Sequence, residues 1–152
     1  MTATAHAIVG TLLAARFVDP LVSLPLALGT HYLTDLVPHW DSGTNRRKKS
    51  EKRFIFEALV DAFVAVIVST LIYYYFFNLT DFLYLYLVVG FALLPDIVTI
   101  STRFVFKIKS PLWNWNNRFQ SYLNKRLELP WGILTQIAVI GVVYFFLFRV
   151  LI

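Results

Sequence analysis

Residues 54–77 read FIFEALVDAFVAVIVSTLIYYYFF, an almost unbroken apolar run in a chain of 152 residues. A helix needs about 20 mainly apolar residues to cross the hydrocarbon core of a bilayer, and this run is long enough to do so. Two further runs of the same kind cover residues 82–101 and 130–151. The three runs predict an all-α fold, a polytopic membrane helix bundle.

The composition supports a membrane environment. Hydrophobic residues make up 58% of the chain and charged residues only 15%, whereas soluble domains carry about 25% charged residues. The net charge of +5 comes from basic residues that lie beside apolar segments, which favours contact with membrane lipid and predicts no nucleic-acid partner. The chain has no cysteine, so a metal site here needs nitrogen and oxygen ligands.

Two shorter apolar segments, residues 4–18 and 21–37, precede these runs. Fifteen helical residues extend only about 22 Å, so these segments are either tilted spans or the two arms of a re-entrant hairpin. With them, residues 1–152 are expected to form a single integral membrane domain of about five apolar helices. The oligomeric state is left open by the sequence.

Two basic segments alternate with the apolar ones. Residues 42–53 and 102–129 each carry six of the fourteen lysines and arginines. The positive-inside rule places both segments, and with them the N-terminus, on the cytoplasmic side of an inner or plasma membrane. Residues 102–129 also contain Trp113, Trp115, Phe119 and Tyr122, which predicts an interfacial amphipathic segment with aromatic side chains at headgroup depth.

Eight acidic or histidine residues fall within one layer of this predicted topology, at the cytoplasmic face or about 10 Å beneath it. Ionisable residues in membrane segments are costly to insert and commonly serve function. The eight residues are His6, His31, Asp35, His39, Asp41, Glu57, Asp61 and Asp96.

Local spacing within this layer predicts a metal centre. His31 and Asp35 are four residues apart and share one helical face, and Pro38 should end that helix and free His39 to turn over the site. Imidazoles and carboxylates without thiolates suit a divalent metal, zinc above all, with manganese and iron as alternatives. The predicted ligands are His6, His31, Asp35, His39, Asp41, Asp61 and Asp96.

Structural roles compete with this hypothesis for several of the residues. Asp35 is either a ligand or the carboxylate that orients a ligating histidine. Glu57 and Asp61 are alternatively salt-bridged to neighbouring basic residues, and Asp96, which follows Pro95, alternatively caps a broken helix. Asp41 is alternatively part of a turn.

Two stretches carry a resemblance to known families. HYLTDLVPHWD, residues 31–41, resembles the H-x-x-x-D-x-x-x-P-x-H element of zinc-dependent phospholipases C and P1-type nucleases, whose histidines and aspartate bind zinc. TAHAIVG (4–10) and LPDI (94–97) resemble segments of the small, multi-spanning membrane-bound metal-dependent hydrolases. The resemblance implies metal-dependent hydrolysis and implicates His6 and Asp96.

Together these features predict an integral membrane metal-dependent hydrolase that acts near the cytoplasmic leaflet on a lipid-linked phosphoester. Asp35 and Glu57 are the candidate catalytic residues, with Glu57 as general base. The anionic headgroup of the substrate would be attracted by Arg46, Arg47, Lys48 and Lys49. The alternative is a non-catalytic membrane protein, either a scaffold or a transporter or proton relay; an off-centre polar layer without internal repeats disfavours transport.

Overall fold

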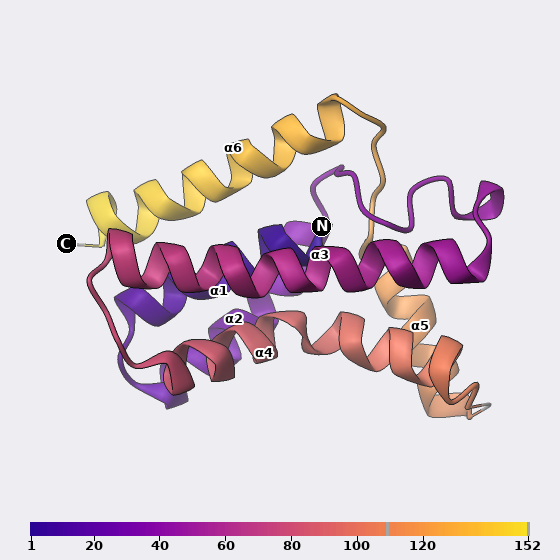
Figure 1. The fold of residues 1–152 in the computed structure, drawn as a ribbon, viewed down its shortest axis with the longest axis horizontal. Helices are drawn as coiled ribbons and strands as arrows, with labels where there is room; N and C mark the ends of the chain where they lie inside the picture. The colour runs from indigo at the N-terminus through magenta and orange to yellow at the C-terminus, as the bar shows by residue number, and fades with distance from the viewer. Residues whose placement is uncertain (109, 152) are drawn as a thin grey trace.

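The computed structural model of the protein describes residues 1–108 and 110–151, which form a bundle of helices (Figure 1). No β-strand occurs among these residues, so the predicted all-α fold is confirmed. The described α-helices are α1 (Ala3–Arg16), α2 (Pro20–Asp35), α3 (Glu51–Leu71), α4 (Phe82–Ile100), α5 (Pro111–Leu123) and α6 (Trp131–Phe145). Short π-helical segments extend α3, α4 and α6 over Ile72–Phe76, Ser101–Val105 and Phe146–Val150, and a 3-10 turn, Arg46–Lys48, precedes α3.

Within the described part of the chain, three helices are long and apolar enough to cross a membrane: Glu51–Phe76, Phe82–Phe104 and Trp131–Val150. The predicted membrane helix bundle is confirmed to this extent. Helices α1 and α2 have 14 and 16 residues, or about 21 and 24 Å at 1.5 Å per residue, less than the roughly 30 Å of a hydrocarbon core. The prediction of five apolar spans is therefore not confirmed.

Polar side chains set helix boundaries that the apolar runs alone do not reveal. Helix α3 begins at Glu51, three residues before the apolar run, because the hydroxyl of Ser50 accepts a hydrogen bond from the backbone N–H of Arg53 at 3.2 Å. Helix α5 lies inside the predicted basic segment 102–129 and exposes Trp115, Phe119 and Tyr122. The helix lies within the predicted interfacial segment, and its location at a membrane surface stays a prediction.

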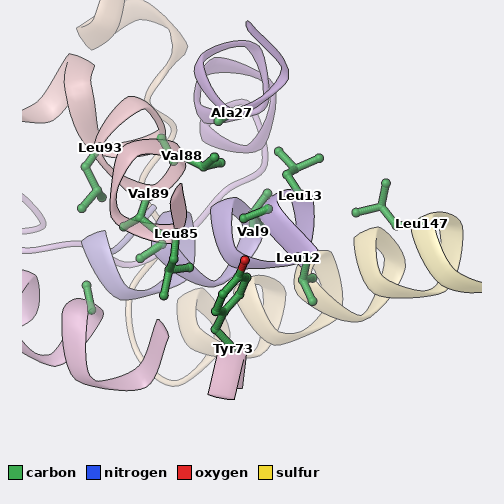
Figure 2. Close-up of a cluster of buried hydrophobic side chains, with 14 residues drawn as sticks. Val9, Leu12, Leu13, Ala27, Tyr73, Leu85, Val88, Val89, Leu93 and Leu147 are labelled. Atoms are coloured by element: carbon green, nitrogen blue, oxygen red, sulfur yellow. The ribbon is translucent and has the colours of Figure 1, made fainter. Parts of the chain in front are cut away.

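Helix α1 lies at the centre of the bundle and contacts α2, α3, α4 and α6. Its apolar residues pack mainly against α4, as Figure 2 shows for Val9, Leu85 and Val88. Gly10 permits the close approach of the two helices, since a Cβ atom there would lie 3.1 Å from the Cβ of Ala92. This short helix is thus enclosed by the others, and it brings its N-terminal turn into the interior.

The outer faces of the long helices carry the opposite pattern. Phe56 and Phe63 on α3 are each 68% exposed, and Ile137 and Val142 on α6 are 61% and 68% exposed. Contiguous apolar surface of this kind is rare on soluble monomers. A lipid environment accounts for these faces.

Figure 1 shows how the bundle positions its polar residues. Both basic segments, including α5, lie at the end where α3 begins and α4 ends. The N-terminus lies beside the middle of α3, and α1 runs from there toward the opposite end, where the chain turns into α2. Helix α2 then returns, so the start of α1 and the end of α2 meet inside the bundle.

Candidate metal centre and the adjoining cavity

The structure brings five of the predicted site residues together where α1, α2 and α4 meet. Asp35 at the end of α2 lies between three imidazoles: its Oδ1 is 3.2 Å from Nε2 of His6 and 3.7 Å from Nε2 of His39, and its Oδ2 is 3.6 Å from Nε2 of His31. Asp96 on α4 places its Oδ1 3.9 Å from Nε2 of His31. We call these five residues the histidine cluster.

Hydrogen bonds determine the tautomers of two of the imidazoles. Nδ1 of His31 lies 2.7 Å from the carbonyl oxygen of Ala92, and Nδ1 of His39 lies 2.7 Å from that of Val37. Because a carbonyl oxygen only accepts, each Nδ1 carries the hydrogen, and the neutral ring keeps its lone pair on Nε2. A backbone carbonyl that fixes the far nitrogen in this way is the usual outer partner of a metal-ligating histidine.

Three acceptor atoms of the cluster have no partner in the part of the chain that the structure describes. Among residues 1–108 and 110–151, no hydrogen-bond partner meets Nε2 of His31, Nε2 of His39 or Oδ2 of Asp35, and all three atoms are buried. Buried polar atoms without partners are rare in folded proteins and call for an explanation. A cation bound beside these atoms would satisfy them.

His39 lies just beyond α2, outside the long apolar helices, and its protonation follows from its surroundings. Burial lowers the pKa of its imidazole below the usual value, and the N-terminal ammonium lowers it further. The ring is therefore neutral at neutral pH. This agrees with the tautomer that its contact with Val37 requires.

His6 completes the cluster from the first turns of α1. Its ring stacks on that of His31, with 3.9 Å between centroids. The hydroxyl of Thr34 donates to the carbonyl of His31 at 3.1 Å and lies 3.4 Å from Nδ1 of His6. The Met1 ammonium donates to Asp35 and lies 2.9 Å from Nε2 of His6, so a positive charge already occupies part of the space between these two residues.

The separations within the cluster agree with shared coordination. Ligand atoms that lie about 2.0 to 2.2 Å from a tetrahedral zinc ion are about 3.3 to 3.6 Å from one another. The distances from the carboxylates of Asp35 and Asp96 to the Nε2 atoms range from 3.2 to 3.9 Å. His6, His31 and Asp96 form a group whose ligand atoms all lie within 4.8 Å of one another.

Residues from the C-terminal third of the chain hold the cluster in place, and the sequence did not single them out. Gln120 on α5 donates from Nε2 to Asp96 at 2.7 Å and accepts a hydrogen bond from Thr99. The backbone N–H of His39 donates to Lys125 at 2.9 Å, and the carbonyl of His39 accepts from Leu127 at 2.7 Å. In the sequence, the signal for such a role is the presence of Gln120 among the aromatic residues of segment 102–129.

The other three predicted site residues have partners elsewhere. Asp61 accepts hydrogen bonds from the backbone N–H groups of Ala3 and Thr4 at 2.7 and 3.1 Å, and so caps the start of α1. No described contact joins Asp61 to an imidazole.

Glu57 and Asp41 form ion pairs in the basic segments. Glu57 accepts from Lys49 at 2.6 Å and from Arg53 at 2.9 Å. Asp41 pairs with Arg126 at 3.1 Å and also accepts from the hydroxyl of Thr44. In the part of the chain that the structure describes, neither carboxylate contacts the histidine cluster.

A cavity of about 890 Å³ adjoins the cluster, and Met1 and Asp96 form part of its wall. Apolar residues of α3 and α4 line one part of it, and basic residues line another. The apolar residues include Phe54, Ala58, Ala62, Leu93, Ile97 and Ile100, and the basic ones are Arg46, Arg47, Lys48, Lys49, Arg103 and Arg126. The volume falls in the range of small-molecule sites, and the lining suits an anionic ligand with an apolar part.

Comparison of the chain with protein-family models, curated protein sequences and solved structures gives no match.

Proposed function

We propose that the protein is an integral membrane metal-dependent hydrolase that acts on a phosphoester near the cytoplasmic leaflet. One observation carries this proposal: three imidazoles and two carboxylates converge, with buried lone pairs on His31 and His39 that no described residue uses. Nitrogen and oxygen donors at these separations suit zinc, with manganese and iron as alternatives. The adjoining basic cavity favours an anionic substrate.

His6, His31, His39 and Asp96 would hold the metal, with Asp35 either as a further ligand or as the group that orients the imidazoles. A divalent metal supplies a hydroxide-like nucleophile at neutral pH and polarises a phosphoryl oxygen. Asp96 belongs to both the cluster and the cavity wall, and Gln120 fixes its orientation. Glu57 is paired with Lys49 and Arg53 and has no described contact with the cluster, so we assign it no role in proton transfer.

The same proposal includes an orientation in the membrane. The basic segments lie together at one end of the bundle (Figure 1), and the positive-inside rule makes that end cytoplasmic. Helices α1 and α2 would then form a hairpin that reaches the cluster from the opposite side, with the start of α1 facing the cytoplasmic half. Polar side chains would meet within the bilayer, shielded from lipid by α3, α4 and α6.

Metal analysis of the detergent-purified full chain tests the proposal. We expect close to one zinc, manganese or iron ion per chain in the wild type and a loss of about tenfold or more in His31→Ala. Asp81→Asn is the matched control, because Asp81 caps α4 at the far end of the bundle and asparagine caps equally well. Equal metal contents in wild type and His31→Ala after incubation with each metal would overturn the proposal.

One contact favours a second candidate, a non-catalytic scaffold. The Met1 ammonium pairs with Asp35 and touches His6, so the cluster can also be seen as a closed network that joins α1 to α2. Under this alternative the purified chain binds no metal, and His31→Ala lowers its thermal stability without any change in metal content. A metal-independent flux in proteoliposomes would favour transport or a proton relay.

A further inference from the structure

Two arginines in the wall of the cavity have no acidic partner. The guanidinium of Arg46 lies over the rings of Phe54 and Phe104, 4.8 and 5.5 Å from their centroids, and Arg103 lies 5.4 Å from the centroid of the same Phe104 ring. Within residues 1–108 and 110–151, neither guanidinium forms an ion pair with a carboxylate. Both guanidiniums lie near the Phe104 ring and carry the same charge, so they repel each other. An anion bound between them would offset this repulsion.

The neighbouring basic residues differ from this pair. Lys49 donates to Glu57 at 2.6 Å and to the carbonyl of Ser42 at 3.0 Å, and Arg126 pairs with Asp41. Arg46 is further oriented by donation from Nη1 to the carbonyl of Lys49 at 2.9 Å. Arg46 is therefore a positioned guanidinium without a carboxylate partner, and Arg103, which is exposed, is a second unpaired guanidinium near the same Phe104 ring. Guanidinium groups match the geometry of a phosphate.

One part of the remaining wall is apolar, and polar side chains, among them Asn45, Thr99 and Gln120, line the rest. The apolar part is formed by Ala58 and Ala62 on α3 and by Leu93, Ile97 and Ile100 on α4. This apolar part suits a hydrocarbon chain. The cavity thus combines a cationic part with an apolar part between two membrane-length helices.

We propose that Arg46 and Arg103 form a clamp for the phosphate headgroup of a membrane lipid, whose hydrocarbon chain lies between α3 and α4. This proposal rests on the proposed function, because it names the substrate class of the same site. Asp96 lines the same cavity, so a clamped phosphate would lie in the cavity that adjoins the histidine cluster. The clamp adds Arg103 to the predicted headgroup residues and assigns the main contact in the 46–49 run to Arg46.

Binding of fluorescently labelled phosphatidic acid to the full chain in a neutral detergent tests the clamp. We expect Arg46→Gln/Arg103→Gln to weaken binding by about tenfold or more. The matched control is Lys52→Gln/Arg118→Gln, which removes the same charge from exposed residues outside the cavity wall and should change affinity by less than about twofold. Equal losses in the two double variants would overturn the clamp.

Two further arms identify the source of the phosphate and separate this proposal from the previous one. Glycerol 3-phosphate should not displace the labelled lipid at equal concentration, and displacement would overturn the commitment to a lipid. The His31→Ala chain, treated with a chelator, should still bind phosphatidic acid, since the clamp does not include the metal ligands. A chain that binds the lipid but no metal would refute only the hydrolase proposal; one that binds metal but no lipid would refute only the clamp.

Discussion

Gly132 at the start of α6 lies directly against the segment that carries His39. A Cβ atom at this position would meet the carbonyl oxygen of Leu127, and it would lie 2.5 Å from the backbone nitrogen of Trp40 and 2.7 Å from the Cβ of Trp40. Two of these atoms belong to the backbone, so a side-chain rotation cannot relieve the overlap. Gly132→Ala must therefore push residue 40 away from α6.

The expected loss in free energy of unfolding follows from the contacts that this shift affects. Overpacking costs about 1 to 3 kcal/mol. The displaced segment also loses the hydrogen bond from the N–H of Trp40 to the carbonyl of Gly132 at 3.1 Å, worth about 0.5 to 1.5 kcal/mol. The better helix propensity of alanine offsets up to about 1 kcal/mol. With the full offset, the net loss is about 0.5 to 3.5 kcal/mol, which corresponds to a fall of about 1 to 14 °C in Tm for a chain of this size.

Thermal unfolding in detergent, followed by tryptophan fluorescence, measures this effect. Gly141→Ala in the same helix is the matched control, because no atom lies within 4 Å of the added Cβ, and it should raise Tm slightly or leave it unchanged. Since Trp40 follows His39 directly, Gly132→Ala should also weaken zinc binding by about tenfold. Equal Tm values for the two variants would refute the claim that α6 fixes the His39 segment.

Three substitutions test individual assignments. Gln120→Ala removes the hydrogen bond to Asp96 and should lower metal affinity by about 10- to 100-fold; unchanged affinity contradicts the positioning role. Asp61→Ala should lower Tm by about 2 to 8 °C through loss of the α1 cap while metal content, measured by elemental analysis, stays constant. Glu57→Gln should leave phosphoesterase activity within about twofold of wild type, whereas a general base would show a loss of about 100-fold or more.

The long apolar runs and the i, i+4 pair of His31 and Asp35 could be read from the sequence because both depend on local spacing. The predicted layer also grouped His6 and Asp96 with that pair, and the fold brings these residues together. Residues at equal depth face different directions around a helix, however. A helix that is apolar on all sides gives no periodic signal for its orientation.

Asp61 and Glu57 illustrate this limit. Both lie on α3 at the predicted depth, yet Asp61 faces the first turn of α1 and Glu57 faces Lys49 and Arg53. The free N–H groups at the start of a buried helix need acceptors, and α3 supplies Asp61 as one. This need exists only after α1 has entered the bundle, so spacing along the chain could not reveal it.

The run Arg46 to Lys49 shows the same distinction for charge. In sequence the four cations are equivalent, and their attraction to anionic lipid follows from composition alone. In the fold Lys49 is neutralised by Glu57, Arg47 and Lys48 are exposed, and Arg46 is held over two aromatic rings. Long-range attraction depends on total charge, whereas recognition depends on a charge that is fixed in place and unpaired. Under the proposed clamp, one short run would serve both roles. Arg46 differs from its neighbours because Phe54 and Phe104, which the fold brings together, orient its guanidinium.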